Sequence, residues 1–124
     1  MPTNEQEQQV ANAPAPAPDP ENAFLGKIIS HIEQHLDEAE FGVPEMSRAM
    51  GLSQSQLYRK IKALTDLSTA GFIRNVRLTK GKHLLETTDL TVSEVAYEVG
   101  FTSPNYFSDA FLEMFGARPT NMRK

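Results

Sequence analysis

The chain has 124 residues, a formal net charge of −4 and no cysteine. A chain of this length forms one ordinary domain or two very small ones, which excludes a large multidomain enzyme. The absence of cysteine excludes disulfide scaffolds, thiolate zinc sites and cysteine nucleophiles. No basic residue precedes Lys27, and no apolar run approaches the roughly 18 residues that span a bilayer. We therefore expect a cytoplasmic protein with no signal peptide and no membrane partner.

Charges are unevenly distributed along the chain. Residues 48–82 carry eight basic residues and one acidic residue, whereas residues 83–117 carry six acidic residues and no Lys or Arg. A basic block of this kind favours a surface that meets an anion such as nucleic acid. The alternative is a solvated, charged helix face, which is common in any protein.

The first segment differs in composition from the rest of the chain. Residues 1–22 contain four acidic residues and no Lys or Arg, and Pro alternates with small or polar residues from Ala13 to Pro20. Such a composition favours an extended polyproline II conformation and buries no apolar surface. We predict a disordered N-terminal tail or linker over residues 1–22 and a folded domain over residues 23–124.

Three helices are predicted first in the folded part. Ala23 opens a helix of roughly four turns, whose apolar positions recur at three- and four-residue spacing: Phe24, Leu25, Ile28, Ile29, Ile32 and Leu36. A short second helix runs from Pro44 to Met50, because Pro is favoured in a first turn and Gly51 follows as a C-cap. Ser53 caps a third helix, with Gln56 as its capping-box partner. The expected buried positions of that third helix are Leu57, Ile61 and Leu64.

Three further helices follow. Ser68 caps a long fourth helix that extends to about Glu86, with expected buried positions at Phe72, Ile73, Val76, Leu84 and Leu85. Thr91 and Glu94 form another capping box and open a fifth helix that closes at Gly100. Ser103 and Pro104 supply the cap and first-turn proline of a sixth helix, which ends near Gly116. No segment alternates with period two over a strand length, so the fold class is all-α.

The most informative feature is an internal repeat. Residues 43–53 align with residues 92–102, and Leu57 and Ile61 then match Phe107 and Phe111 after one inserted residue. Each copy predicts a short helix, a turn with glycine at positive φ and a capped second helix, which is the helix-turn-helix layout. We place the first helix-turn-helix at about residues 43–65 and the second at about residues 91–116. The linker helix between them covers about residues 69–86.

From about Phe24 to Lys124 the chain resembles the AraC/XylS family of DNA-binding domains. The resemblance is carried by Leu52–Lys62, Phe72–Leu78, Leu84-Leu85, Val92–Phe101, Asn105–Phe107, Phe111, Phe115-Gly116 and Pro119. It implies two helix-turn-helix subdomains joined by a long linker helix, in a sequence-specific transcription regulator. The segments Phe41–Val43 and Ser55–Lys62 are similar to the output domain of hybrid two-component regulators, in which a receiver or sensor domain lies upstream.

The third helix is the predicted reader of DNA. Opposite its apolar face lie Gln54, Ser55, Tyr58, Arg59 and Lys62. Gln pairs with adenine and Arg with guanine in the major groove, while Ser and Tyr reach bases or phosphates. The resemblance implies that Ser55, Tyr58 and Arg59 read bases and that Gln54, Lys60 and Lys62 hold the backbone. We also expect Arg48 to touch the backbone from the second helix.

The second copy departs from the family pattern. Asp109 stands at the repeat position of Arg59, where the family usually has a basic residue, and an acidic group there repels phosphates although it accepts from cytosine N4. Pro104, Asn105 and Ser108 remain candidate groove contacts. The second motif is therefore either a weak, cytosine-biased reader, which we favour, or a scaffold for the first. Met122 also replaces the usual aromatic residue near the end of the chain.

The length of the linker helix predicts how far apart the two recognition helices lie. A helix of about 18 residues spans roughly 27 Å, which holds two recognition helices near one DNA turn apart, roughly 34 Å. One chain then reads two successive major-groove segments without dimerising.

Arg74 and Arg77 both lie on this helix. The resemblance implies a structural junction for Arg77, paired with an acidic residue, with phosphate contact as its second role.

Other functions have weaker support. His31 and His35 have the i, i+4 spacing of metal ligands but lack the surrounding motif, so we predict polar surface residues, no metal and no cofactor. No Gly-rich phosphate loop or paired-carboxylate site is present, and we expect no enzyme. The remaining alternative is a protein-interaction module of the same fold, whose acidic second half meets a basic protein surface such as that of RNA polymerase.

Overall fold

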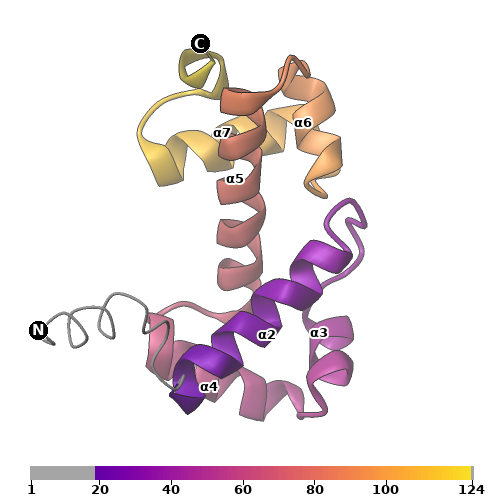
Figure 1. Cartoon of the computed structure of the whole chain (residues 1–124), viewed down its shortest axis with the longest axis vertical. Helices are drawn as coiled ribbons and strands as arrows, with labels where there is room; N and C mark the ends of the chain where they lie inside the picture. The colour runs from indigo at the N-terminus through magenta and orange to yellow at the C-terminus, as the bar shows by residue number, and fades with distance from the viewer. Residues whose placement is uncertain (1–18, 124) are drawn as a thin grey trace, which may run out of the picture.

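The computed structural model describes residues 19–123 and is helical throughout, with no strand among these residues (Figure 1). This confirms the all-α class. The predicted tail falls on residues 1–18, outside the described part, and on the start of the first helix. The elements are α2 (Pro20–Gln34), α3 (Val43–Met50), α4 (Gln54–Thr65), α5 (Thr69–Thr87), α6 (Val92–Glu98), α7 (Pro104–Phe115) and the 3₁₀ helix η1 (Pro119–Met122). None of these helices is both long and apolar enough to cross a membrane.

The first helix begins three residues earlier than its apolar stripe predicts. The side chain of Asp19 accepts a hydrogen bond from the backbone N–H of Asn22 at 2.7 Å, and Pro20 occupies the first turn of α2. An acidic N-cap followed by proline is a helix start signal. Asp19 and Pro20 also continue the Pro-rich run, so the sequence pattern assigns them to the tail rather than to a helix start.

The predicted caps are present in the structure. Ser53 and Gln56 form a reciprocal capping box at the start of α4, with hydrogen bonds of 2.9 and 3.1 Å. Thr91 and Glu94 form the same box at the start of α6, at 2.8 and 3.0 Å. The hydroxyl groups of Ser68 and Ser103 likewise cap the N-termini of α5 and α7. These bonds pair backbone N–H groups that a helix start leaves without partners.

The two copies of the repeat fold alike. In the first, the N–H of Gly51 donates to the carbonyl of Arg48, and the N–H of Leu52 donates to the carbonyl of Ser47. The second copy has the equivalent bonds from Gly100 and Phe101 to Tyr97 and Ala96, and both glycines have positive φ, +70° and +87°. The repeat in the sequence is therefore a repeat of backbone geometry.

Each copy has its own core, and α5 runs through both. The first core gathers residues of α2, the loop after it, α3, α4 and the first half of α5: Ile28, Ile32, Phe41, Met46, Leu57, Ile61 and Ile73. The second gathers residues of the second half of α5, α6, the turn after α6 and α7: Leu78, Leu85, Val95, Ala96, Val99, Phe101, Phe107, Ala110 and Phe111. In Figure 1, α5 is the vertical helix that connects the lower unit to the upper one.

The buried row of α5 differs in part from the predicted one. Ile73 and Leu85 are buried as expected, but Phe72, Val76 and Leu84 are only half-buried. The buried row advances by four residues from Thr69 to Leu85 and so winds slowly around the helix, from one core to the other. Three members of this row, Thr69, Arg77 and Gly81, are not large apolar residues, so hydrophobic periodicity does not detect it.

Arg77 is the buried link between the two units. The residue is 4% exposed, and its two terminal nitrogens donate hydrogen bonds of 2.5–3.1 Å to four backbone carbonyls. Val99, at the end of α6, supplies one of these carbonyls. The other three, those of Leu36, Glu38 and Phe41, belong to the loop between α2 and α3. Arg77 thus occupies the junction expected for it, but the expected acidic partner is wrong, because carbonyl oxygens receive all four bonds.

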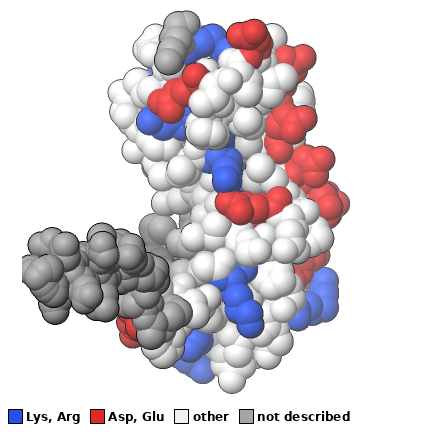
Figure 2. All heavy atoms as spheres, in the orientation of Figure 1, with Lys and Arg blue, Asp and Glu red and all other residues white. Residues whose placement is uncertain are grey.

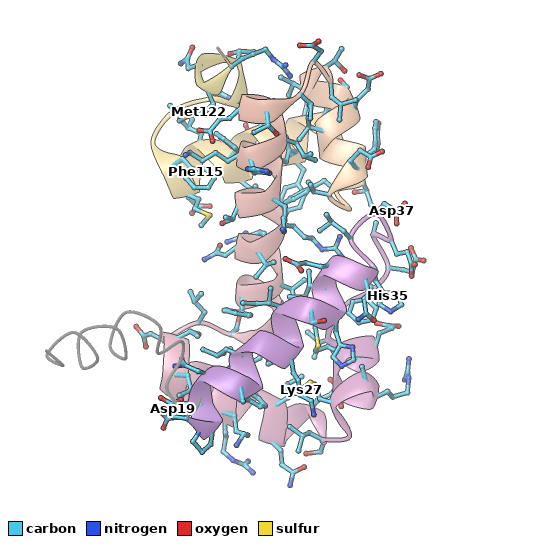
Figure 3. All side chains as sticks on the ribbon, viewed as in Figure 1. Asp19, Lys27, His35, Asp37, Phe115 and Met122 are labelled. Carbon is cyan, nitrogen blue, oxygen red and sulfur yellow. The ribbon has the colours of Figure 1, made fainter. Side chains whose placement is uncertain are left out.

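The charge of Arg77 is buried at some cost. Burial lowers the pKa of the Arg77 guanidinium, and the nearby carboxylates of Glu40, Asp37 and Glu38 oppose this shift. Arginine nevertheless stays protonated in proteins, so all of its N–H groups remain available as donors. Figure 3 shows Asp37 on the loop after α2, at the end of the lower unit that faces the upper one.

Gly100 makes room for this guanidinium. A Cβ atom on Gly100 would lie 1.4 Å from Arg77 Nη1 and 2.5 Å from the carbonyl oxygen of Leu36. A Cβ atom on Gly51, the same position in the first repeat, would meet no atom within 4 Å. Position 100 therefore requires glycine for two reasons, its positive φ and the space that the Arg77 guanidinium occupies. Position 51 requires glycine only for its positive φ.

Replacing Gly100 by alanine is expected to destabilise the fold far more than replacing Gly51. Gly51→Ala costs the left-handed backbone strain, about 1–2 kcal/mol. Gly100→Ala adds the displacement of Arg77 from buried carbonyls, for a total of about 4 kcal/mol or more. Urea unfolding followed by circular dichroism measures both losses. Equal losses would contradict the assigned role of Gly100.

Candidate nucleic-acid interface

The first recognition helix, α4, is fixed by two buried side chains. Leu57 and Ile61 are fully buried in the first core, and the cap at Ser53 sets where the helix begins. With these positions held, the first two turns present a defined face to solvent. Gln54, Ser55, Tyr58 and Arg59 are all exposed on it.

These four predicted site residues line one surface groove. Its other wall is formed by Val43 and by the start of α5, at Ser68, Thr69 and Ala70. Tyr58 is 45% exposed although it carries a large aromatic side chain. The groove therefore combines an amide, two hydroxyl groups and a guanidinium on one rigid helix, the groups that read base edges and phosphates in a major groove.

The other predicted contacts of the first motif lie outside this groove. Lys62 donates to the carbonyl of Asp66 at 3.1 Å. Lys60 lies on the opposite flank of α4, with Nζ 4.8 Å from the centre of the Phe24 ring on α2. Arg48 is on α3, where its guanidinium is 3.5 Å from a carboxylate oxygen of Glu45. The structure thus gathers four of these seven predicted residues and separates the other three.

The second recognition helix, α7, repeats the geometry of α4. Phe107 and Phe111 are fully buried at the positions that match Leu57 and Ile61. Asn105 and Asp109 are exposed on the outer face, and Pro104 and Ser108 are half-buried. Tyr106, which was not predicted as a site residue, is 49% exposed.

Asp109 has a partner that the sequence did not indicate. Its carboxylate lies 3.6 Å from the guanidinium of Arg118, a residue that precedes η1. Arg118 lies outside the basic block, and nothing in its spacing points to α7, so only the fold brings the pair together. The pairing reduces the repulsion that an unpaired carboxylate would exert on phosphates, although a surface ion pair of this kind is weak.

Several cations of the basic block, residues 48–82, are paired with carboxylates in the folded chain. Lys62 pairs with Asp66 at 3.6 Å, Lys80 with Glu33 at 2.9 Å and Lys82 with Glu86 at 3.1 Å. Arg59 takes part in none of the ion pairs within residues 19–123. Part of the block therefore forms local pairs, and the guanidinium of Arg59 remains available to an external anion.

Acidic side chains follow one edge of the molecule. Figure 2 shows them along the right edge, beside the loop after α2 and beside α6. The exposed acidic residues in these two elements are Asp37, Glu38, Glu40, Glu94 and Glu98. None of them lines the groove at α4.

His35 is a partly exposed polar residue, as expected, and it also packs on a neighbouring ring. It caps the end of α2, and its ring stacks on Phe41 with centroids 4.3 Å apart and planes 4° apart. Its Nδ1 atom lies 3.0 Å from a carboxylate oxygen of Glu38. Within residues 19–123 no three His, Asp or Glu side chains form a cluster suited to a metal ion.

Two relatives are similar over most of this chain. A protein of Formosa agariphila named histidine kinase P4 is 36% identical over 96 residues, which are 77% of this chain and 7% of that protein. The transcriptional regulator MtrA of Neisseria gonorrhoeae is 36% identical over 100 residues, which are 81% of this chain and 33% of MtrA. The chain therefore spans only a third or less of the length of these relatives.

Solved structures with the same fold include two domains of regulators. The C-terminal domain of AraT, a response regulator from Geobacillus stearothermophilus, has a TM-score of 0.73 and 25% identity, over 87% of each chain. The DNA-binding domain of AdpA, solved in complex with a target DNA, has a TM-score of 0.70 and 28% identity, over 78% of this chain and 86% of that one. A family model described as a helix-turn-helix domain matches residues 46–124. With its two repeated units on one linker helix, the chain belongs to the AraC/XylS family of helix-turn-helix domains.

Proposed function

We propose that this chain is the sequence-specific DNA-binding part of a transcription regulator, in which α4 enters a major groove and supplies most of the recognition. The observation that carries this proposal is the groove lined by Gln54, Ser55, Tyr58 and Arg59. The likeness to the AdpA domain, which was solved on its target DNA, supports it independently.

Each of the four residues has a role that follows from its chemistry. Arg59 donates two hydrogen bonds to a guanine edge, and Ser55 and Tyr58 reach neighbouring bases or phosphates. Gln54, in the first turn of α4, holds the backbone and sets the register of the helix. Lys60, Lys62 and Arg48 add weaker, sequence-independent attraction from the flanks.

The second unit contributes less. Among Pro104, Asn105, Ser108 and Asp109 there is no cation, and the only guanidinium paired with them within residues 19–123 is that of Arg118. Phosphate neutralisation supplies most of the affinity of protein–DNA complexes, so α7 binds weakly. Asn105 and Ser108 contact base edges, and Asp109 favours cytosine through its N4 amino group.

The linker helix sets the distance between the two readers. α5 has 19 residues, which corresponds to about 28 Å at 1.5 Å per residue. One turn of DNA is about 34 Å, so one chain reaches two successive major-groove segments with modest DNA bending.

We further propose that an upstream receiver or sensor domain controls this DNA-binding part, as in two-component systems. Two likenesses support this: the AraT domain is the C-terminal part of a response regulator, and the Formosa relative is named a histidine kinase. RNA polymerase would be the protein partner of such a regulator.

A second candidate function is a protein-interaction module with little specific DNA binding. The acidic edge formed by Asp37, Glu38, Glu40, Glu94 and Glu98 favours it, because such an edge complements a basic protein surface. The edge and the groove at α4 do not share residues, so variants in the groove separate the two functions.

Arg59→Ala is expected to weaken binding to the preferred duplex by about 10- to 100-fold, because a bidentate Arg–guanine pair contributes about 1–3 kcal/mol. The preferred duplex is first selected from a random library, and affinities are measured by fluorescence anisotropy across a salt series. Lys80→Ala, which removes a cation paired with Glu33 outside the groove, is the control and loses less than threefold. No enrichment of any duplex, or equal losses in both variants, would favour the protein-interaction module.

Asp109→Asn is expected to strengthen duplex binding about three- to tenfold, because it removes a negative charge from α7 and releases Arg118 from its pair. The variant also loses any preference for cytosine at the base pair that Asp109 contacts. Repeating the library selection with this variant measures both effects. An unchanged affinity and an unchanged selected site would assign α7 to a scaffold role.

A further inference from the structure

Arg74 lies on α5 between the two recognition helices and faces a second groove. This groove is bounded by the start of α3, at Gly42 and Val43, by the turn between α6 and α7, at Phe101 and Thr102, and by Tyr106 in the first turn of α7. Val43 and Ala70 line both this groove and the groove at α4. A continuous hollow surface therefore runs from the first recognition helix, across α5, to the first turn of the second.

The guanidinium of Arg74 is short of partners. Its Nε atom is buried and has no hydrogen-bond partner within residues 19–123, and none of the ion pairs there includes Arg74. Arg77, one turn further along α5, bonds four carbonyls by contrast. The two terminal nitrogens of Arg74 are not among the buried atoms without a partner, and no hydrogen bond within residues 19–123 includes them. Their N–H groups are therefore available to an acceptor in the groove, and a charged donor of this kind favours an anion.

Position and chemistry together identify that ligand. When two recognition helices occupy successive major grooves on one face of B-DNA, the surface between them faces the minor groove and its bordering sugar–phosphate strands. A guanidinium matches the two free oxygens of a phosphodiester in bidentate geometry. The first turn of α5, at Ser68, Thr69 and Ala70, opens on the same hollow surface, and its dipole favours the same negative charge.

We propose that Arg74 binds a phosphodiester of the DNA backbone at the minor groove between the two major-groove segments. This inference rests on the proposed function and deepens it, because it assigns a backbone contact to the linker helix itself. The contact fixes the central part of the DNA against α5 and carries no sequence preference.

The first test compares Arg74→Gln with Lys80→Gln in the full chain. Both variants remove one cation from α5, but Lys80 pairs with Glu33 and lines a different groove. For Arg74→Gln we expect a loss of about three- to tenfold on every duplex and a slope of log K against log salt that is about 0.9 shallower. Lys80→Gln leaves the slope at the wild-type value, because Lys80 neutralises no phosphate in this arrangement. Equal slopes in the two variants would overturn the proposal.

A second test maps the contact on the DNA, starting with the wild-type protein. Wild-type protein is titrated against duplexes that carry one neutral methylphosphonate at successive central positions of the selected site. We expect one central position to weaken wild-type binding, and the same substitution to have no effect on Arg74→Gln. Arg74→Lys keeps the positive charge but loses the bidentate geometry of the guanidinium. We expect its binding to be weakened by the neutral phosphate, but less than that of the wild type.

The outcomes separate this inference from the proposed function. Wild-type protein that selects no duplex would refute the proposed function and with it this contact. Specific wild-type binding with no sensitive central phosphate would refute only the contact of Arg74. Sensitivity to the central base pairs rather than to the phosphates would also overturn it, because Arg74 would then read base edges in the minor groove.

Discussion

The bonds of Arg77 to four carbonyls fix how the two helix-turn-helix units are arranged. One guanidinium takes three acceptors from the loop between α2 and α3 and one from the end of α6. Burying a charge costs several kcal/mol, and hydrogen bonds to a charged donor recover about 1.5–3 kcal/mol each. The hydrogen bonds offset the cost of burying the Arg77 charge only when all four carbonyls are in place. The two units therefore have one relative arrangement in which every bond of Arg77 forms.

This constraint explains why the two units differ although their sequences repeat. Gly51 and Gly100 hold the same backbone conformation, but only Gly100 lies against Arg77. The second unit supplies the acceptor at Val99, while the first unit carries the polar groove at α4. One recognition helix thus supplies most of the proposed recognition, and the other is held at a fixed distance from it by α5.

Much of the fold is predictable from the sequence because its signals are local. Capping boxes at Ser53 and Thr91 and the turn glycines act within a few residues, and the structure confirms them. The partners of Arg77 were not predictable, since a backbone carbonyl has no signature in the sequence. The pairing of Asp109 with Arg118 and the stacking of His35 on Phe41 were missed for a related reason. The first pair joins α7 to the residue before η1, and the second depends on the path of the loop between α2 and α3, so residue type and helical spacing do not reveal either pair.

For the site, residue type and helical spacing indicated one face made of Gln54, Ser55, Tyr58, Arg59 and Lys62. The structure places the first four in one groove and Lys62 outside it. The basic block was a less reliable guide, because several of its cations form local pairs that sequence charge counts do not reveal.

Residual dipolar couplings of backbone amides test most directly whether Arg77 joins the two units into one rigid body. The couplings would be measured in a weakly aligned solution for the wild-type chain and for Arg77→Met. For the wild-type chain, we predict that couplings from α3 and α4 and from α6 and α7 fit a single alignment tensor. For Arg77→Met, each unit still fits its own structure, but the two units require different tensors. A wild-type chain that needs two tensors, or a variant that keeps one, would contradict the account.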